Sequence, residues 1–470
     1  MQKKANEHRY RHEEIIQNCF IFYLVCSVKT DIADENMPSY QPKPYVEIKH
    51  PEWSKNATIY EVNIRQYTNE GTFNAFSKHL PRLKKLGVDI LWLMPIHPIG
   101  EKNRKGEKGS YYAIKDYKAI NPEFGSLDDL KKLVKKAHNM GMYVILDWVA
   151  NHSAWDNPLT KSNPEWYTKD HHGNFQPTPW WDWSDIIDFD YHQPAMRKYM
   201  TETLKYWIIE ADIDGYRADV AGFIPTDFWD NVRTELDAIK PVFMLAEWDA
   251  RDLHKKAFDM SYAWDLHDVL TKLNKGDADA SSVYHHFAHF LNAWPDNAIK
   301  MNFVDNHDKN SWEQSMFERF GPYLSASIVL TATAEGMPLL YSGQEAGLDR
   351  SLSFFDKDEI QWQQHPVGDL YKQLFALKHQ NKALWNGNWG GKMLPVPNTN
   401  PKAIFSFVRE KDNDKVFVVI NFSDQVQTAK FNETVQLGTY TEYFSQQKAT
   451  FSTNSQIKMP AYGYKVFIKQ

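Results

Sequence analysis

The stretch DGYRADVAGF (214–223) places an arginine two residues before an aspartate, inside a run that otherwise has the composition of a buried strand. Charged side chains are costly to bury without partners, so Arg217 and Asp219 predict a polar site. Residues two apart on a strand point to the same side, and we therefore expect the Arg217 guanidinium beside the Asp219 carboxylate. A neighbouring cation keeps a carboxylate ionised, and an ionised carboxylate can act as a nucleophile.

A second carboxylate, Glu247, is flanked by Ala246 and Trp248. An apolar setting raises the pKa of a carboxyl group, which lets it act as a general acid near neutral pH. A nucleophilic carboxylate and an acidic carboxyl about 5–5.5 Å apart are the equipment of a retaining glycosidase.

More polar residues follow other apolar runs: Asp147, Asn151, His152, His307 and Asp308. A third carboxylate with two histidines can hold the hydroxyl groups of a sugar ring.

Eight short apolar runs alternate with amphipathic helical patterns, and they span residues 57–64, 88–96, 142–149, 213–220, 242–248, 261–265, 300–306 and 337–343. Between the second and third runs, Ser126 and Asp129 have the spacing of a capping box. This alternation predicts a parallel sheet covered by helices, an α/β fold closed as a (β/α)8 TIM barrel. The carboxyl ends of barrel strands converge on one face, so the polar residues above are expected to meet in one cleft.

The pattern of apolar and polar residues changes along the chain, and these changes predict its domain organisation. Residues 53–384 form the catalytic barrel, with a short inserted subdomain at about 152–190 after the third strand. Residues 385–470 are short alternating strands, which predict a C-terminal antiparallel β domain of β-sandwich type. Residues 29–52 are polar and contain prolines, as expected of a linker.

Residues 1–28 carry a polar, mostly basic segment followed by an apolar run too short to span a membrane, which predicts a signal peptide. YLVC before Ser27 also resembles a bacterial lipoprotein signal that would lipidate Cys26, although Leu24 is one place too close and Val25 replaces a small residue. We expect export to the bacterial cell envelope (periplasm or outer membrane), with membrane attachment only through that lipid. The alternative is a buried or disordered N-terminal arm.

The bulk composition narrows the partners. The net charge of −6 gives no electrostatic reason to expect a nucleic acid partner. Both cysteines lie within the first 26 residues, so neither a disulfide framework nor a cysteine-ligated metal site is expected in the main body. Aromatic residues make up 14% of the chain and include 17 Trp, which suits a cleft for sugar rings as well as a core. A monomer is the default expectation.

Four segments resemble, in order, the signature regions of the α-amylase superfamily (glycoside hydrolase family 13): DWVANH (147–152), DGYRADV (214–220), MLAEW (244–248) and FVDNHD (303–308). The resemblance runs over roughly residues 53–470. It implies that Asp219 is the nucleophile, Glu247 the acid/base and Asp308 the transition-state stabiliser of a double displacement.

The same resemblance implies the substrate-binding residues. Arg217 positions and ionises Asp219. His152 and His307 bind hydroxyls of the sugar to the left of the scissile bond, and Tyr112 stacks on that same sugar. Trp248, next to the acid, is expected to contact the leaving-group side.

The chain departs from the family at Gly222 and Phe223, where many α-amylases carry a Lys-His pair that contacts the leaving-group sugar. The backbone of that histidine can also bind a structural calcium. Asn151 resembles a calcium-ligating asparagine and Asp188 is a candidate for a second oxygen ligand, but calcium takes six to eight ligands. A structural calcium is therefore left open, no metal ligands are assigned, and no cofactor is required for the chemistry. The alternative role of Asn151 is a hydrogen-bonding brace.

These observations favour endo-acting hydrolysis of α-1,4-glucosidic bonds in starch or malto-oligosaccharides, an α-glucan substrate. The alternative is a neopullulanase, cyclomaltodextrinase or α-glucosidase; the missing Lys-His pair favours it, and the lack of an evident extra N-terminal β domain speaks against it. A third hypothesis, a non-catalytic glucan-binding protein, conflicts with the presence of all three carboxylates.

Overall fold

The computed structural model describes residues 41–469, and the predictions for residues 1–28 lie outside the described residues. The elements below all belong to one compact unit, Tyr45–Gln470. Within residues 41–469, the structure contains no helix with the length and apolar character needed to cross a membrane.

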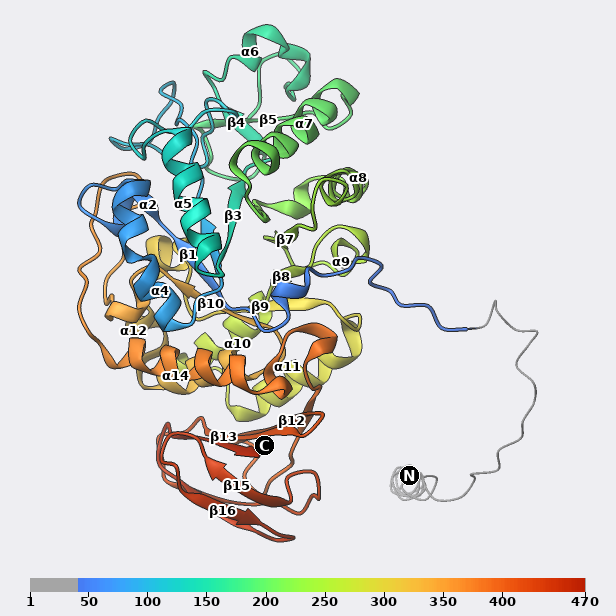
Figure 1. Cartoon of the computed structure of the whole chain (residues 1–470), viewed down its shortest axis with the longest axis vertical. Helices are drawn as coiled ribbons and strands as arrows, with labels where there is room; N and C mark the ends of the chain where they lie inside the picture. Colours follow the sequence, from blue (N-terminus) through green and yellow to red (C-terminus); the bar gives the residue numbers. More distant parts are fainter. Residues whose placement is uncertain (1–40, 470) are drawn as a thin grey trace, which may run out of the picture. The chain divides into compact units, whose positions relative to one another are not determined.

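Eight parallel strands close into a barrel, which confirms the predicted (β/α)8 fold (Figure 1). In order around the barrel they are β1 (Ile59–Val62), β2 (Ile90–Leu93), β3 (Tyr143–Trp148), β6 (Gly215–Ala218), β7 (Phe243–Ala246), β8 (Met260–Tyr262), β9 (Ile299–Asn302) and β10 (Met337–Tyr341). Each strand overlaps one of the eight apolar runs. The fit is poorest at β8, which ends at Tyr262 because the helix α10 already begins at Trp264.

Helices separate the strands. They are α2 (Ile64–Tyr67), α3 (Phe73–Phe76), α4 (Leu80–Leu86), α5 (Leu127–Asn139), α7 (Pro194–Ala211), α8 (Thr226–Asp237), α9 (Leu253–Lys256), α10 (Trp264–Lys275), α11 (Ala280–Ala293), α12 (Met316–Phe320), α13 (Leu324–Thr333) and α14 (Pro366–Gln380). The predicted capping box is present at the start of α5, where the side chains of Ser126 and Asp129 each bind the backbone of the other. Helix α4 ends at Gly87, whose φ of +103° is left-handed and suits glycine.

The barrel interior is a packed apolar core. Ile59, Ile90, Ile145, Phe243 and Met301 are among its buried side chains. Toward the carboxyl ends of the strands the buried side chains become polar: Glu61 on β1, Asp147 on β3 and Arg217 on β6 are each 0% exposed. Asp147 and Arg217 lie opposite each other in the β3–β6 register. The strand ends therefore carry the charged residues, as expected of a barrel enzyme.

The insertion after β3 contains a two-stranded antiparallel sheet, β4 (His152–Ala154) with β5 (Ile186–Asp188), and the short helix α6 (Leu159–Ser162). A small apolar cluster of Ile99, Ala113, Ala154 and Ile186, with Trp183 packed against it, joins this insertion to the loop after β2. The insertion is thereby held against the barrel.

The last strands form two antiparallel sheets, which confirms the predicted C-terminal β domain. The six-stranded sheet contains β11 (Met393–Pro395), β12 (Ile404–Lys411), β13 (Asp414–Asn421), β15 (Gly438–Glu442), β16 (Lys448–Phe451) and β18 (Tyr464–Lys469), and the two-stranded sheet pairs β14 (Gln427–Lys430) with β17 (Gln456–Met459). Arg409 on β12 donates to the backbone oxygen of Ala334, just after α13, at 2.7 Å, and so ties this domain to the barrel helices.

The second half of the predicted linker packs on the barrel. His50 is buried, and its Nδ1 lies 2.6 Å from Asp259 Oδ1. The domain boundaries themselves remain predictions.

Candidate active site

A cavity of about 490 Å³ lies at the carboxyl ends of the barrel strands. Of the predicted site residues, Tyr112, His152, Asp219, Glu247, His307 and Asp308 line it. Arg217 is fully buried and binds two of these lining carboxylates. Trp248 is not among the residues that line the cavity.

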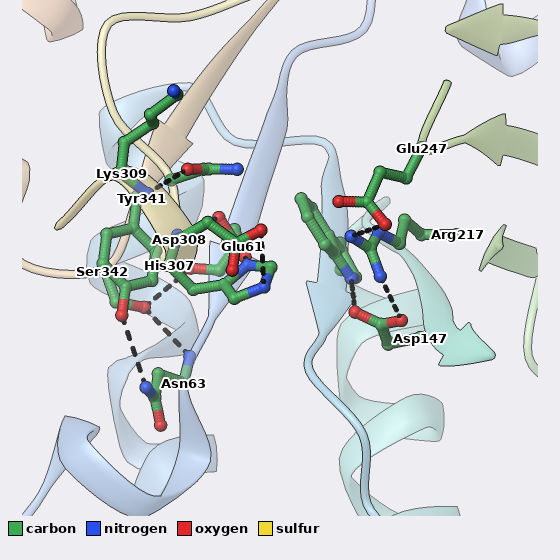
Figure 2. Close-up of polar contacts among 12 residues, drawn as sticks. Glu61, Asn63, Asp147, Arg217, Glu247, His307, Asp308, Lys309, Tyr341 and Ser342 are labelled. Carbon is green, nitrogen blue, oxygen red and sulfur yellow. Dashed lines mark hydrogen bonds and ion pairs between the residues drawn. The ribbon is translucent and has the colours of Figure 1, made fainter. Parts of the chain in front are cut away.

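The Arg217 guanidinium is the centre of one half of the site (Figure 2). Its Nη1 donates to Asp219 Oδ1 and to Asp147 Oδ1, both at 2.8 Å, and its Nη2 lies 2.9 Å from Glu247 Oε2. The strand register explains this arrangement: Ala218 pairs with Ala246, so Asp219 and Glu247 follow directly on neighbouring strands. One buried cation therefore binds three carboxylates that are far apart in the sequence.

The environment of Glu247 suits a proton donor. The pKa of Glu247 is raised to about 8, and burial of the carboxyl group is the largest cause. Burial and the nearby Asp219 and Asp308 together outweigh the Arg217 charge, which lowers the pKa. The carboxyl group of Glu247 is thus protonated at neutral pH.

The backbone after Asp219 is strained. Val220 has a φ of +37°, in the left-handed region that β-branched residues rarely adopt. In this conformation the Val220 N–H donates to Glu247 Oε2 at 2.8 Å. The strained residue thus links the backbone that follows Asp219 to the Glu247 carboxyl group.

His307 is the centre of the other half of the site, which Figure 2 draws around Glu61 and Asp308. Its Nδ1 binds Glu61, its Nε2 lies 2.8 Å from Tyr112 Oη, and the same nitrogen is 3.3 Å from Asp308 Oδ2. Burial disfavours the charged ring, but Asp308 and Glu61 outweigh it and raise the pKa of His307 to about 9. His307 is therefore a cation at neutral pH that donates from both ring nitrogens.

Tyr112 and Asp147 connect the two halves. Tyr112 Oη donates to Asp147 Oδ2 at 3.1 Å, and Trp92 Nε1 donates to the same oxygen at 3.0 Å. Both oxygens of Asp147 are therefore bound, Oδ1 by Arg217 and Oδ2 by Tyr112 and Trp92. This leaves Asp147 as a support for the site, whereas Asp219 and Glu247 face the cavity.

Asn151 and Asp188, the two residues considered for calcium, bind each other. Asn151 Nδ2 donates to Asp188 Oδ1 at 3.1 Å, and the Thr178 hydroxyl donates to the same oxygen at 2.5 Å. Among the described residues, no group of three or more His, Cys, Asp or Glu side chains is arranged to hold a metal ion. The contacts fit the bracing role of Asn151, and a structural calcium stays the open question that the sequence raised.

Trp248 packs against Gly222 and Phe223 beside the cavity. A Cβ atom at Gly222 would lie 2.2 Å from the Trp248 ring, so only glycine leaves room for this position of the ring. The rings of Phe223 and Trp248 meet edge to face with 5.2 Å between their centroids, and the Trp181 ring centroid lies 6.3 Å from that of Phe223. Two tryptophans of the insertion have different positions. Trp183 lines the cavity, and the ring of Trp181 stacks on the ring of Trp183 with 5.1 Å between the ring centroids.

Several residues of the site were not assigned a role from the sequence: Glu61, Lys105, Asp185, Trp312, Phe354 and Phe355. For Glu61 a signal was available, because a glutamate in the middle of the apolar run ATIYEVNI requires a buried partner. Of the others, Trp312 stands in the short helical segment Lys309–Glu313, and the rest stand in loops whose local sequence carries no periodic pattern.

The chain is similar to known proteins over most of its length. The family model for the alpha amylase catalytic domain matches residues 53–380, and the model for the alpha-amylase SusG C-terminal domain matches residues 404–463. The solved structure of a noncanonic maltogenic alpha-amylase from Thermotoga neapolitana is 31% identical with a TM-score of 0.81, and the match covers 89% of this chain and 99% of that one.

Two curated relatives are more distant. A maltogenic alpha-amylase from Bacillus acidopullulyticus is 25% identical over 90% of this chain and 80% of its own length. A cyclomaltodextrinase from Thermoanaerobacter pseudethanolicus is 25% identical over 82% of this chain and 73% of its own. On the matched catalytic domain and on the similarity to the Thermotoga enzyme, the chain belongs to the α-amylase family of glycoside hydrolases.

Proposed function

We propose that this glycoside hydrolase cleaves α-1,4-glucosidic bonds in short or cyclic malto-oligosaccharides with retention of configuration. The observation that carries the retaining chemistry is the shared Arg217 contact of Asp219 and Glu247, combined with the raised pKa of Glu247. The relatives named maltogenic amylase and cyclomaltodextrinase support short or cyclic substrates over long starch chains. So do Gly222 and Phe223 in place of Lys-His. We therefore prefer this alternative to the endo-acting amylase.

In the first step Asp219 attacks the anomeric carbon while Glu247 donates its proton to the glycosidic oxygen. The bond from the anomeric carbon to the leaving oxygen breaks, and an ester bond to Asp219 forms. Arg217 keeps Asp219 ionised for this attack. The leaving-group sugar departs with the proton of Glu247.

In the second step the Glu247 carboxylate takes a proton from water, and the resulting hydroxide displaces Asp219 from the anomeric carbon. The product has the α configuration, Asp219 is again ionised, and Glu247 is again protonated. Asp308 stabilises the positive charge that develops on the sugar ring, because its carboxylate is negative. His307 and His152 bind hydroxyl groups of the same ring, and Tyr112 stacks on it.

Other properties remain predictions from the sequence: export to the bacterial envelope, a lipid on Cys26, and a monomeric state.

The test is a product profile over time on soluble starch, pullulan and β-cyclodextrin, with Glu247→Gln as the inactive control. We expect faster cleavage of β-cyclodextrin and malto-oligosaccharides than of starch. Rapid loss of starch iodine colour without action on the other two substrates would return the protein to endo-acting amylases. Glucose as the sole product would indicate an α-glucosidase, and binding without hydrolysis would indicate a glucan-binding protein.

A further inference from the structure

Lys105 and Asp185 line the same cavity as Asp219 and Glu247, but the catalytic contacts described above use neither of them. Lys105 belongs to the loop between β2 and α5, and Asp185 immediately precedes β5 in the insertion. Lys105 Nζ lies 4.0 Å from Asp185 Oδ1. Two oppositely charged groups from separate segments thus meet in the cavity wall.

Asp185 lacks hydrogen-bond donors. Its residue is 5% exposed, and within residues 41–469 its side chain accepts no hydrogen bond. The 4.0 Å separation from Lys105 is too long for one. The carboxylate lines the cavity, and its oxygens are not among the fully buried polar atoms that lack a partner. Its acceptor positions are therefore open to a donor group of a ligand in the cavity.

Lys105 is held in place from the insertion side. Its Nζ donates to the backbone oxygen of Asp182 and lies 3.6 Å from Asp182 Oδ1. An ammonium group has three donors, so the Asp182 carbonyl leaves further donors available to a ligand.

The loop that carries Lys105 is fixed on its other side as well. The Glu107 N–H donates to Asp356 Oδ1 and the Lys108 N–H donates to the Phe355 backbone oxygen, both at 2.9 Å. The loop thus connects the insertion with the loop after β10, and Lys105 and Phe355 both face the cavity. This anchoring gives Lys105 a defined position before any ligand binds.

The chemistry of the pair selects its ligand. A carboxylate beside an ammonium offers acceptors and donors within a few ångströms, which matches neighbouring hydroxyl groups. An anionic ligand would meet Asp182 and Asp185, and a cationic one would meet Lys105. Trp183 lies between Asp182 and Asp185 in the sequence and also lines the cavity. Its ring adds an aromatic surface suited to a sugar ring. A neutral polyhydroxyl ligand fits best.

We propose that Lys105 and Asp185 bind two hydroxyl groups of one glucosyl unit of the substrate and so set which chain lengths bind well. This inference rests on the proposed function, because it takes malto-oligosaccharides as the substrate. Asp185 accepts from one hydroxyl and Lys105 donates to its neighbour. Both are binding residues and take no part in the transfer of the proton or the glucosyl group.

The test compares Lys105→Met and Asp185→Asn with the matched control Lys108→Met. Lys108 stands three residues from Lys105 on the same loop, but its Nζ binds Glu123 at 2.7 Å on an exposed surface. Initial rates are measured on 4-nitrophenyl α-glucoside and on maltotriose through maltoheptaose. We expect both site variants to raise KM about 10-fold for oligosaccharides long enough to reach the pair, with kcat retained. The control and the 4-nitrophenyl substrate show no change.

Two results would overturn the proposal. KM values unchanged in both variants across the series would show that the pair does not contact the substrate. An equal loss on all substrates, accompanied by a lower unfolding temperature, would assign the pair to holding the loops together. If the wild type hydrolyses none of these substrates, the proposed function fails separately, and calorimetric binding of maltohexaose to the wild type and both variants then decides whether the pair contacts the sugar.

Discussion

Two buried arginines of this molecule each bind more than one carboxylate, yet their surroundings differ. Arg217 binds Asp147, Asp219 and Glu247 at the cavity. Arg233 on α8 binds Asp259 Oδ2 and Asp237 Oδ2, both at 2.7 Å. Asp259 also accepts from the Met244 N–H and pairs with His50.

The balance of charge separates the two clusters. Burial alone would raise the pKa of Asp259, but Arg233 and His50 hold it below its usual value. At the cavity one guanidinium faces three carboxyl groups, and burial raises the pKa of Glu247 to about 8 and that of Asp147 to about 6. A satisfied arginine cluster stabilises the fold, whereas an excess of buried carboxyl groups leaves a proton available for catalysis.

The largest expected effect is on catalysis at the cavity cluster. Asp219→Asn removes the proposed nucleophile but keeps the size of the side chain, so we expect kcat/KM to fall at least about 10⁴-fold. Rates on β-cyclodextrin and maltohexaose measure this loss, and circular dichroism confirms that the variant is folded. Activity within tenfold of the wild type would refute the role of Asp219.

The second effect is on stability at the Arg233 cluster. Asp259→Ala leaves Arg233 and His50 without their shared buried partner, so we expect the free energy of unfolding to fall by about 3–5 kcal/mol. Urea unfolding measures this change. The folded fraction should keep the wild-type kcat, because Asp259 does not line the cavity. A stable variant with reduced kcat would remove the contrast between the two clusters.

The third effect is a pH dependence that only the cavity cluster should produce. Glu247 must be protonated in the free enzyme, and its raised pKa of about 8 places the loss of that proton on the alkaline side. We therefore expect kcat/KM to be level around neutral pH and to fall as pH rises through 8. The profile is measured by initial rates, with circular dichroism at each pH as the control for unfolding. A decrease of kcat/KM with rising pH that is centred near pH 5 would contradict a protonated Glu247 at neutral pH.

The smallest expected effect is that of a chelator. Because Asn151 binds Asp188 directly, we expect EDTA to change neither the rate nor the unfolding temperature. Thermal unfolding with EDTA or with added calcium measures this. A lower unfolding temperature in EDTA, restored by calcium, would show that this pair or another part of the chain binds the ion.

Most of the fold followed from local patterns. The eight apolar runs correspond to the eight barrel strands, and Ser126 with Asp129 caps α5 as its spacing predicts. The pairing of Arg217 with Asp219 also follows from the sequence, because residues two apart on a strand share a face. These features depend on residues only a few positions apart, so the sequence alone is enough to predict them.

What only the tertiary structure decided depends on contacts between distant segments. The missing side chain at Gly222 lets the Trp248 ring pack beside the cavity, and the contact of Trp248 with the leaving-group sugar stays a prediction. The partner of His307 is Glu61, from the opposite end of the barrel sequence, and Lys105 meets Asp185 through two separate loops. The proton on Glu247 likewise depends on burial and on Asp219 and Asp308, which the closed barrel brings together. The sequence determined which side chains stand at the strand ends, and the closure of the barrel decided which of them touch.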